Sequence, residues 1–416
     1  MGEPIRDDAL LTDVEPAEVG LDAGRLERID AHFARYVDDG RLAGWLVLVA
    51  RHGRIAHVAT CGHRDRERDL PVSADTLWRL YSMTKPVTSV AALMCYEEGL
   101  FELKDPVSRW IPSFAGARVY RGGSSSDTAT APVNEPVRVW HLLTHTAGLT
   151  YGFHHAHPVD ALYRAAGFEW GTPPGMDLAG CCDAWAGLPL LYEPGSEWNY
   201  SVATDVLGRV VEVASGQSLE EFFRTRIFQP LDLRDLAFWA EGPAAERLAA
   251  LYTAHPRRKT AVPADGRGAE QRPPAWSGGS GLIGTARDYY RFAEMLRRGG
   301  ELDGTRLLGP RTVSYMTRNH LPGDVDLERF GRRLFAETAF DGVGFGLGVS
   351  VVLDPAATKV LGSKGEYGWG GAASTAFWVS PSDDLTVLFL TQLLPSSTHP
   401  IRTQLKQLVY QAVLDA

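Results

Sequence analysis

Three residues have side chains suited to nucleophilic acyl chemistry, Ser82, Lys85 and Tyr200, and the first two also have a suitable spacing. Ser82 and Lys85 stand three residues apart at the start of a helix predicted over 83–99, so both side chains fall on one helix face and can meet. Pro86 agrees with a helix start there, because proline is tolerated in a first turn. The beginning of a helix also presents unpaired N–H groups and a positive dipole end, which stabilise a developing oxyanion.

The lysine stands out because this chain strongly prefers arginine, with 36 arginines against 6 lysines. Arginine cannot release a proton at usable pH, whereas a buried lysine can titrate near neutrality. A lysine is therefore the cation that a general base requires. The pattern Ser-x-x-Lys is weak by itself, since a helix-capping serine beside a surface lysine produces the same spacing.

Tyr200 lies between a Glu-Pro-Gly-Ser turn over 193–196 and an apolar helix predicted over 203–215. From such a position its hydroxyl can project into a cleft. A free tyrosine ionises only near pH ~10, so it needs a neighbouring cation to act as a base, and Lys85 can supply one. The alternative is that Tyr200 is simply a buried residue between two elements.

A glycine-rich run over 365–374 contains Trp369, Gly370, Gly371 and Ala372 and leads into a strand predicted over 372–379. Glycines at such a place let a ligand or another backbone approach closely. A strand edge there can also offer a backbone N–H to an acyl oxygen. A glycine-rich turn without any catalytic part is the alternative.

The order of these segments resembles the serine β-lactamase and penicillin-binding superfamily, and within it the class C β-lactamase-like esterases (family VIII carboxylesterases). Two further runs support the resemblance, Val-Trp-His-Leu-Leu-Thr-His-Thr-Ala-Gly-Leu over 139–149 and Gly-Gly-Ser-Gly-Leu-Ile-Gly-Thr-Ala-Arg-Asp over 278–288. The resemblance implies that Ser82 is the acylated nucleophile and that Lys85 and Tyr200 share the base role. It also implies an oxyanion hole from the N–H groups of Ser82 and Ala372, and a supporting hydrogen bond from Tyr151.

Two departures from the superfamily pattern point to the esterase branch. Residues 200–202 read Tyr-Ser-Val where the pattern has Tyr-x-Asn, and residues 369–371 read Trp-Gly-Gly where it has Lys-Thr-Gly. The groups that would bind the amide and the carboxylate of a β-lactam are therefore missing. A neutral, aromatic-lined pocket is expected instead, with Phe153 and Trp369 as walls beside Gly370 and Gly371.

We therefore predict a serine esterase that hydrolyses carboxylic esters, with short acyl chains, through an acyl-enzyme. Other acyl-group enzymes on the same scaffold remain open: an acyltransferase, an amide or oligomer hydrolase, or a weak β-lactamase. A sensor that is acylated and not turned over is a further alternative. The residues do not distinguish these functions, because the steps up to the acyl-enzyme are shared.

Residue patterns that would indicate a metal site, a cofactor site or another class of hydrolase are weaker than the pattern around Ser82. His141 and His145 have the spacing of a zinc helix, but Leu142 replaces the glutamate of that motif. The histidines His154, His155 and His157 are interpreted as a solvated loop. No Gly-x-Ser-x-Gly elbow, dinucleotide-binding glycine motif or Walker loop occurs, so neither a metal nor a cofactor is expected. The net charge of −9 disfavours nucleic acid as a partner.

The positioning elements indicate an α+β fold, in which an antiparallel sheet is flanked by helices and interrupted by a mostly helical insertion. An α/β domain is predicted from residues 1–80 and 340–416, a helical domain from 81–339, and the active site at their boundary. Helices are predicted over 22–39, 203–215, 219–228, 286–298 and 399–416. Strands are predicted over 45–51, 55–61, 345–353, 372–379 and 385–392, the first two as a hairpin.

The N-terminal residues lack the basic start and apolar core of a leader, and no run of 18 apolar residues occurs. A cytoplasmic enzyme acting on a small-molecule ester, with no membrane partner, is therefore expected. Four cysteines with neither zinc nor disulfide spacing are predicted to be free thiols. Oligomeric state and the identity of the acyl and alcohol groups are left open.

Overall fold

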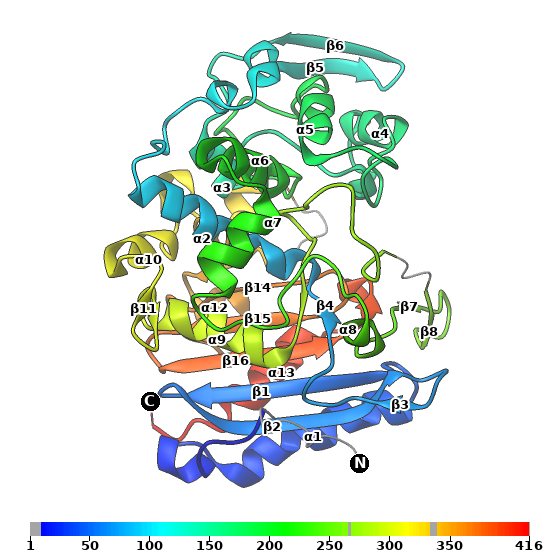
Figure 1. Ribbon diagram of the computed structural model, residues 1–416, viewed down its shortest axis with the longest axis vertical. Coiled ribbons are helices and arrows are strands. Elements are labelled where there is room, and N and C mark those ends of the chain that lie inside the picture. Colours follow the sequence, from blue (N-terminus) through cyan, green and yellow to red (C-terminus); the bar gives the residue numbers. More distant parts are fainter. Residues whose placement is uncertain (1–9, 265–267, 333–338, 416) are drawn as a thin grey trace.

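A computed structural model describes residues 10–264, 268–332 and 339–415. Its main element is an eight-stranded antiparallel sheet in the order β12-β13-β14-β15-β16-β1-β2-β3 (Figure 1). The strands are β1 (Gly44–Arg51), β2 (Arg54–Asp65), β3 (Leu70–Pro71), β12 (Val343–Phe345), β13 (Ser350–Val352), β14 (Tyr367–Gly370), β15 (Ala376–Ser380) and β16 (Leu385–Thr391). The two ends of the chain meet where β1 pairs with β16, from Trp45 opposite Thr391 to Arg51 opposite Leu385.

The predicted hairpin is confirmed. Strands β1 and β2 are joined at His52 and Gly53, both with positive φ, at 56° and 72°. This is the backbone that a two-residue turn needs to match the right-handed twist of its strands. Every residue of β1 is buried, as expected for a central strand that is covered on both faces.

Helices cover both faces of the sheet, and the alternation of side chains along β1 shows which helices face which side. Trp45, Val47 and Val49 share a core with α1 (Ala23–Asp38) and α13 (Ile401–Tyr410). The intervening positions 46, 48 and 50 belong to a second core that includes α2 (Thr84–Glu97) and α9 (Ala286–Arg297). The arrangement confirms the predicted fold class, with helices layered on an antiparallel sheet.

Helices α3 (Val139–Leu143), α4 (Pro158–Ala165), α5 (Leu178–Ala186) and α6 (Ala203–Ser215) lie on the far side of α2 from the large sheet (Figure 1). Helix α6 packs against α2, α3 and α5, while α7 (Leu219–Phe222) continues into a π-helical segment, Phe223–Phe228. The other helices are α8 (Pro243–Glu246), α10 (Pro310–Met316), α11 (Leu327–Phe330) and α12 (Pro355–Thr358). Short strand pairs lie outside the eight-stranded sheet. They are β4 (Trp78–Arg79) with β9 (Ile283–Gly284), β5 (Arg118–Ser124) with β6 (Asp127–Pro132), and β10 (Glu301–Leu302) with β11 (Thr305–Arg306). A three-stranded sheet joins β17 (Leu393–Leu394), β7 (Tyr252–Ala254) and β8 (Ala261–Pro263).

Two predicted strands differ from those observed. The single strand expected over 345–353 is a pair, β12 and β13, because the chain turns at Gly348, where φ is +89°. A Cβ at Gly348 would lie 1.9 Å from Ser89 Oγ on α2, so only glycine fits this contact. The strand expected from residue 372 begins at Ala376, because residues 371–375 form a tight turn.

The sheet and the helical part share one hydrophobic core. Helix α9 belongs by sequence to the region 81–339, yet it packs on β15 and β16 of the sheet. The helix α2, which carries Lys85, lies between the sheet and α6. The turn at Tyr81 and the helix α2 that follows it are therefore packed between the sheet on one side and α6 on the other.

In the described residues, no helix combines the length and apolarity required to span a bilayer. Residues 1–8, on which the expectation about a leader rests, lie outside the described part of the chain. All four cysteines are free thiols, as the sequence predicted.

Candidate active site

Ser82 lies in a short 3-10 turn, Tyr81–Met83, that leads directly into α2. Tyr81 has a φ of +47°, a strained conformation for a residue with a side chain. The turn is held by the Tyr289 hydroxyl, which donates to the Met83 carbonyl at 2.9 Å, and by the Thr84 hydroxyl, which accepts from the Leu282 N–H at 3.0 Å. These contacts from distant segments fix the direction of the Ser82 side chain, which is only 6% exposed.

Lys85 is nearly fully buried, with 1% of its surface exposed. Its Nζ donates to Ser82 Oγ at 3.2 Å, to Tyr151 Oη at 3.2 Å and to the Gly279 carbonyl at 2.8 Å. Three acceptors match the three N–H bonds of an ammonium group. The predicted meeting of Ser82 and Lys85 is therefore present, and Tyr151 makes the kind of hydrogen bond that the resemblance implied.

Tyr200 reaches the same serine from the helical part, just before α6. Its hydroxyl donates to Ser82 Oγ at 2.5 Å, and Lys85 Nζ lies 4.5 Å from its ring centroid. The backbone there is anchored, since His154 Nε2 donates to the Tyr200 carbonyl at 2.7 Å and Asn199 Nδ2 donates to the Leu149 carbonyl at 2.9 Å. The three candidate residues thus form one hydrogen-bonded cluster.

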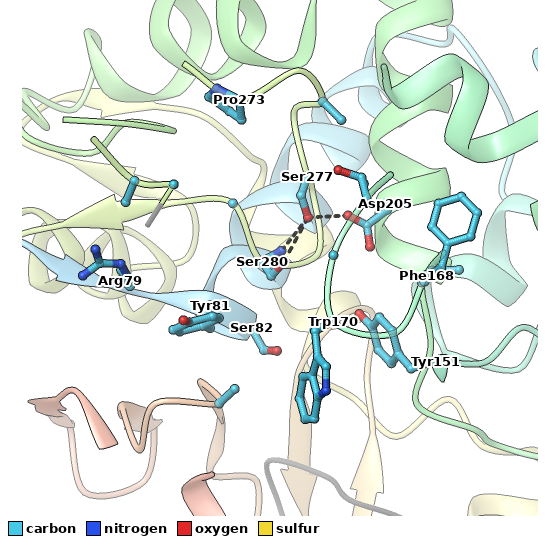
Figure 2. A pocket seen from close by; sticks show the side chains of 18 of the residues that line it. Arg79, Tyr81, Ser82, Tyr151, Phe168, Trp170, Asp205, Pro273, Ser277 and Ser280 are labelled. Atoms are coloured by element: carbon cyan, nitrogen blue, oxygen red, sulfur yellow. Dashed lines mark hydrogen bonds between the residues drawn. The ribbon is translucent and has the colours of Figure 1, made fainter. Parts of the chain in front are cut away.

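Asp205 supports this cluster, a role that the sequence analysis did not assign. Its Oδ1 accepts from the Gly279 N–H at 3.0 Å and from Ser277 Oγ at 2.5 Å, and so holds the loop whose carbonyl binds Lys85 (Figure 2). Burial raises the pKa of Asp205, while the charge of Lys85 and these hydrogen bonds oppose that effect. A Cβ at Gly279 would lie 2.4 Å from the carboxylate, so the loop requires glycine here. The available signal was an acidic residue in the first turn of an otherwise apolar helix.

Ser82 and Ala372, whose N–H groups are the expected oxyanion donors, both line the same cavity. Among the described residues, neither N–H donates to a protein acceptor. The residue before Ala372 packs against the chain just before Ser82: a Cβ at Gly371 would lie 2.4 Å from the Leu80 carbonyl. Two free donors beside a serine hydroxyl are the arrangement that an oxyanion hole requires.

The cavity in front of Ser82 has a volume of about 750 Å³. Tyr151, Phe153 and Trp170 form a stack along one side, with ring centroids 4.7 and 4.8 Å apart and interplanar angles of 19° and 10°. Figure 2 shows Tyr151 and Trp170 on one side of Ser82, and Tyr81 and Arg79 on the other. Trp170 is 72% exposed and so marks the mouth of the cavity.

The expected neutral lining is only partly correct. Arg79 also lines the cavity, with Nη1 donating to the Ala249 carbonyl at 2.6 Å, and burial lowers the pKa of its guanidinium. Phe153 lines the cavity, whereas Trp369 is buried behind Tyr200, with ring centroids 5.6 Å apart, and packs against Phe345. Gly370 and Gly371, also expected at the pocket, likewise lie off the cavity wall.

The histidines near the site have structural positions. His145 is buried 5.1 Å from the Tyr200 ring, and its pKa is well below the usual value because of burial and the nearby Lys85 charge. His141 accepts from the Arg138 N–H, and burial followed by the Arg138 charge lowers its pKa to about 4. Within the described ranges, no three His, Cys, Asp or Glu side chains gather closely enough to hold a metal ion.

A buried serine before a helix, a lysine one turn later and a tyrosine from a helical insertion, all against an antiparallel sheet, define a serine enzyme of the β-lactamase and penicillin-binding fold. The chain belongs to the Beta-lactamase family, whose model matches residues 29–411.

Named relatives are similar along most of the chain. Esterase EstB of Burkholderia gladioli is 34% identical over 418 residues, covering 95% of this chain and 98% of the relative. Acyltransferase calJ of Penicillium decumbens is 31% identical over 342 residues, covering 78% of each chain. The structure of EstCE1, a hydrolase with promiscuous acyltransferase activity, is 30% identical, covers 94% of this chain and 98% of its own, and superposes with a TM-score of 0.78.

Proposed function

We propose that this protein is a serine esterase that hydrolyses small carboxylic esters through an acyl-enzyme on Ser82. The observation that carries the proposal is the double hydrogen bond to Ser82 Oγ, from Lys85 Nζ and Tyr200 Oη, at the wall of a large cavity. The similarity of the chain to esterase EstB and to the hydrolase EstCE1 also supports ester hydrolysis.

In the proposed acylation step, Lys85 and Tyr200 share the base role: the Lys85 amine takes the proton of the Tyr200 hydroxyl, and the resulting ammonium charge stabilises the phenolate that acts on Ser82. Ser82 Oγ gives its proton to Tyr200 and bonds to the ester carbonyl carbon. The carbonyl oxygen becomes an oxyanion on the N–H groups of Ser82 and Ala372. The tetrahedral intermediate then breaks its bond to the alcohol oxygen, which takes the proton back from Tyr200 and leaves as the alcohol.

In deacylation, water takes the place of the alcohol and gives a proton to the same base. Its oxygen bonds to the acyl carbon, the bond to Ser82 Oγ breaks, and Ser82 regains the proton as the acid leaves. An alcohol that enters instead of water would receive the acyl group, so acyl transfer is the second candidate. The cavity volume and the similarity to acyltransferase calJ favour testing it directly.

A panel of p-nitrophenyl esters of increasing acyl length tests the proposal, with intact-protein mass spectrometry to detect the acyl adduct. We expect turnover with short acyl groups and a transient adduct on Ser82. Added alcohol separates the two candidates: a hydrolase forms mainly acid, while a transferase converts the acyl group mainly to the new ester. An adduct that persists for hours without turnover would identify an acylated sensor and contradict the esterase proposal.

Esters should be cleaved far better than the β-lactam nitrocefin. The positions that would bind the amide and the carboxylate of a β-lactam hold Val202, which lines the cavity, and Trp369, which is buried. A neutral hydrogen bond contributes about 0.5–1.5 kcal/mol and one to a charged group about 1.5–3 kcal/mol, so losing both contacts should favour esters by about 30–2,000-fold in kcat/KM. Steady-state kinetics on p-nitrophenyl acetate and nitrocefin measure the ratio, and comparable values would contradict this reading.

Trp170→Ala should weaken binding of esters with an aromatic alcohol. Aromatic pairs contribute about 0.5–1.5 kcal/mol, so KM for a naphthyl ester should rise about 2–10-fold with little change in kcat. KM for the matching ethyl ester should stay unchanged. Tyr315→Ala, at another exposed ring outside the cavity, is the matched control. An equal change for both esters would show that Trp170 does not contact the alcohol.

We place the reaction in a reducing compartment such as the cytoplasm. All four cysteines are free thiols, and burial raises the pKa of Cys95 and Cys181 to about 12, which keeps them in the unreactive protonated form.

A further inference from the structure

A cation from the C-terminal helix contacts the turn that carries Ala372. Arg402, in the first turn of α13, donates from Nη2 to the Gly371 carbonyl at 2.9 Å and to the Thr375 carbonyl at 3.0 Å. The Gly371 N–H donates to the same Thr375 carbonyl at 3.0 Å. One guanidinium nitrogen therefore bridges both ends of the turn over 371–375.

The Gly371 carbonyl and the Ala372 N–H belong to the same peptide group. A trans peptide is planar, and its C=O and N–H bonds point in opposite directions. Ala372 lines the cavity with Ser82, while the carbonyl end of the peptide is held by α13. Fixing the carbonyl therefore fixes the direction of the N–H.

Arg402 also changes the strength of that N–H as a donor. A hydrogen bond from a charged group is stronger than a neutral one, and it draws electron density toward the carbonyl oxygen. The peptide N–H becomes more polar, because hydrogen bonds along one chain strengthen each other. The Ser374 N–H adds a second bond to the Gly371 carbonyl, at 3.0 Å. Both bonds polarise the peptide in the sense that favours binding an oxyanion at Ala372.

Gly370 gives the guanidinium its place. A Cβ at this residue would lie 2.4 Å from Nη2 and 2.5 Å from Cζ of Arg402. Any larger residue would push the arginine away from the turn. Each of the two residues after Trp369 must be glycine for a different reason. A side chain at Gly370 would collide with Arg402, and one at Gly371 would collide with the Leu80 carbonyl.

We propose that Arg402 is a positioning residue that orients and polarises the Gly371–Ala372 peptide for oxyanion binding. The proposal rests on the proposed acylation of Ser82. Arg402 acts through the peptide and touches no substrate atom. Its contribution should appear only when negative charge develops on the acyl oxygen, in the transition state.

Arg402→Met tests this role, because methionine keeps much of the side-chain volume but removes the charge and the donors. Removing an oxyanion donor outright costs about 10²–10³ in kcat, and weakening one should cost about 10–100-fold. KM for p-nitrophenyl acetate should stay within about twofold, because ground-state binding is not involved. The inhibition constant of an aryl trifluoromethyl ketone, which forms a tetrahedral oxyanion with serine, should rise by the same factor as the loss in kcat.

Lys406→Met is the matched control on the same helix. Lys406 forms an ion pair with the buried Glu366 and has no contact with the turn, so its loss should lower the thermal midpoint and leave kcat within about twofold. A folded Arg402→Met enzyme with unchanged kcat would overturn the proposal. The proposal would also fail if Lys406→Met, with a similar fall in thermal midpoint, lost as much kcat as Arg402→Met. Wild-type enzyme and Ser82→Ala are assayed together: an inactive wild type would overturn the esterase function itself.

Discussion

Ester turnover is expected to disappear when Ser82 is replaced by alanine, with the fold unchanged. The substitution removes the atom on which Lys85 Nζ and Tyr200 Oη converge, and no acyl-enzyme can then form. Loss of a catalytic serine in hydrolases costs on the order of 10⁶ in kcat, so we expect a loss of at least about 10⁴ here. Assays with p-nitrophenyl acetate, combined with circular dichroism, measure the loss of activity and the retention of structure.

Covalent labelling identifies the nucleophile independently of turnover. A serine-reactive phosphonate should modify wild-type protein once, at Ser82, and should leave Ser82→Ala unmodified. Ser89→Ala is the matched control, since Ser89 is a buried serine on the same helix that lies outside the cavity. Its activity should remain near that of the wild type. A label on any other serine, or turnover retained in Ser82→Ala, would refute the assignment.

The second large effect is expected at the base. Lys85 Nζ lies 4.5 Å from the Tyr200 ring, and both groups bind Ser82 Oγ. Tyr200→Phe and Lys85→Ala should each reduce kcat by about 10²–10⁴, the usual contribution of a general base. The double variant should be little worse than either single one, because residues that act as a unit are not additive. Losses that multiply in full would mean that the two residues work independently.

Lys85→Arg separates charge from proton transfer. Arginine keeps the positive charge but cannot release a proton, and its planar fork does not fit three acceptors arranged around a single nitrogen. We therefore expect a loss in kcat close to that of Lys85→Ala. Thermal melting of both variants checks that the buried site still folds. Near-native activity in Lys85→Arg would show that only the charge is needed, with Tyr200 as the sole base.

The features predicted correctly from the sequence depend on short stretches of chain. The one-turn separation of Ser82 and Lys85 follows from helix geometry, so their contact could be expected without knowing the fold. The hairpin at His52 and Gly53 follows from two apolar runs separated by a turn signal. Tyr200 was found differently, because only the resemblance to a family connected it to Ser82 across the intervening residues.

The strands predicted over 345–353 and from residue 372 show the limit of local patterns. Both runs are apolar enough for a continuous strand, yet the chain turns at Gly348 against Ser89 and at residues 371–375 against Leu80. Each turn depends on a close approach between segments more than 250 residues apart. The sequence shows the glycine that such a contact requires, but it does not show which distant segment packs against that glycine.

The sequence by itself determined that Ser82 and Lys85 lie one helical turn apart, as a candidate nucleophile and its lysine, because helix periodicity acts over a few residues. Only the tertiary structure decided what surrounds them. It brought the Gly279 carbonyl and Asp205 to Lys85, placed Trp369 behind Tyr200 and outside the cavity, and set Arg402 against Gly371. These contacts arise when two hydrophobic faces pack, and packing depends on the shapes of distant segments that no local pattern contains.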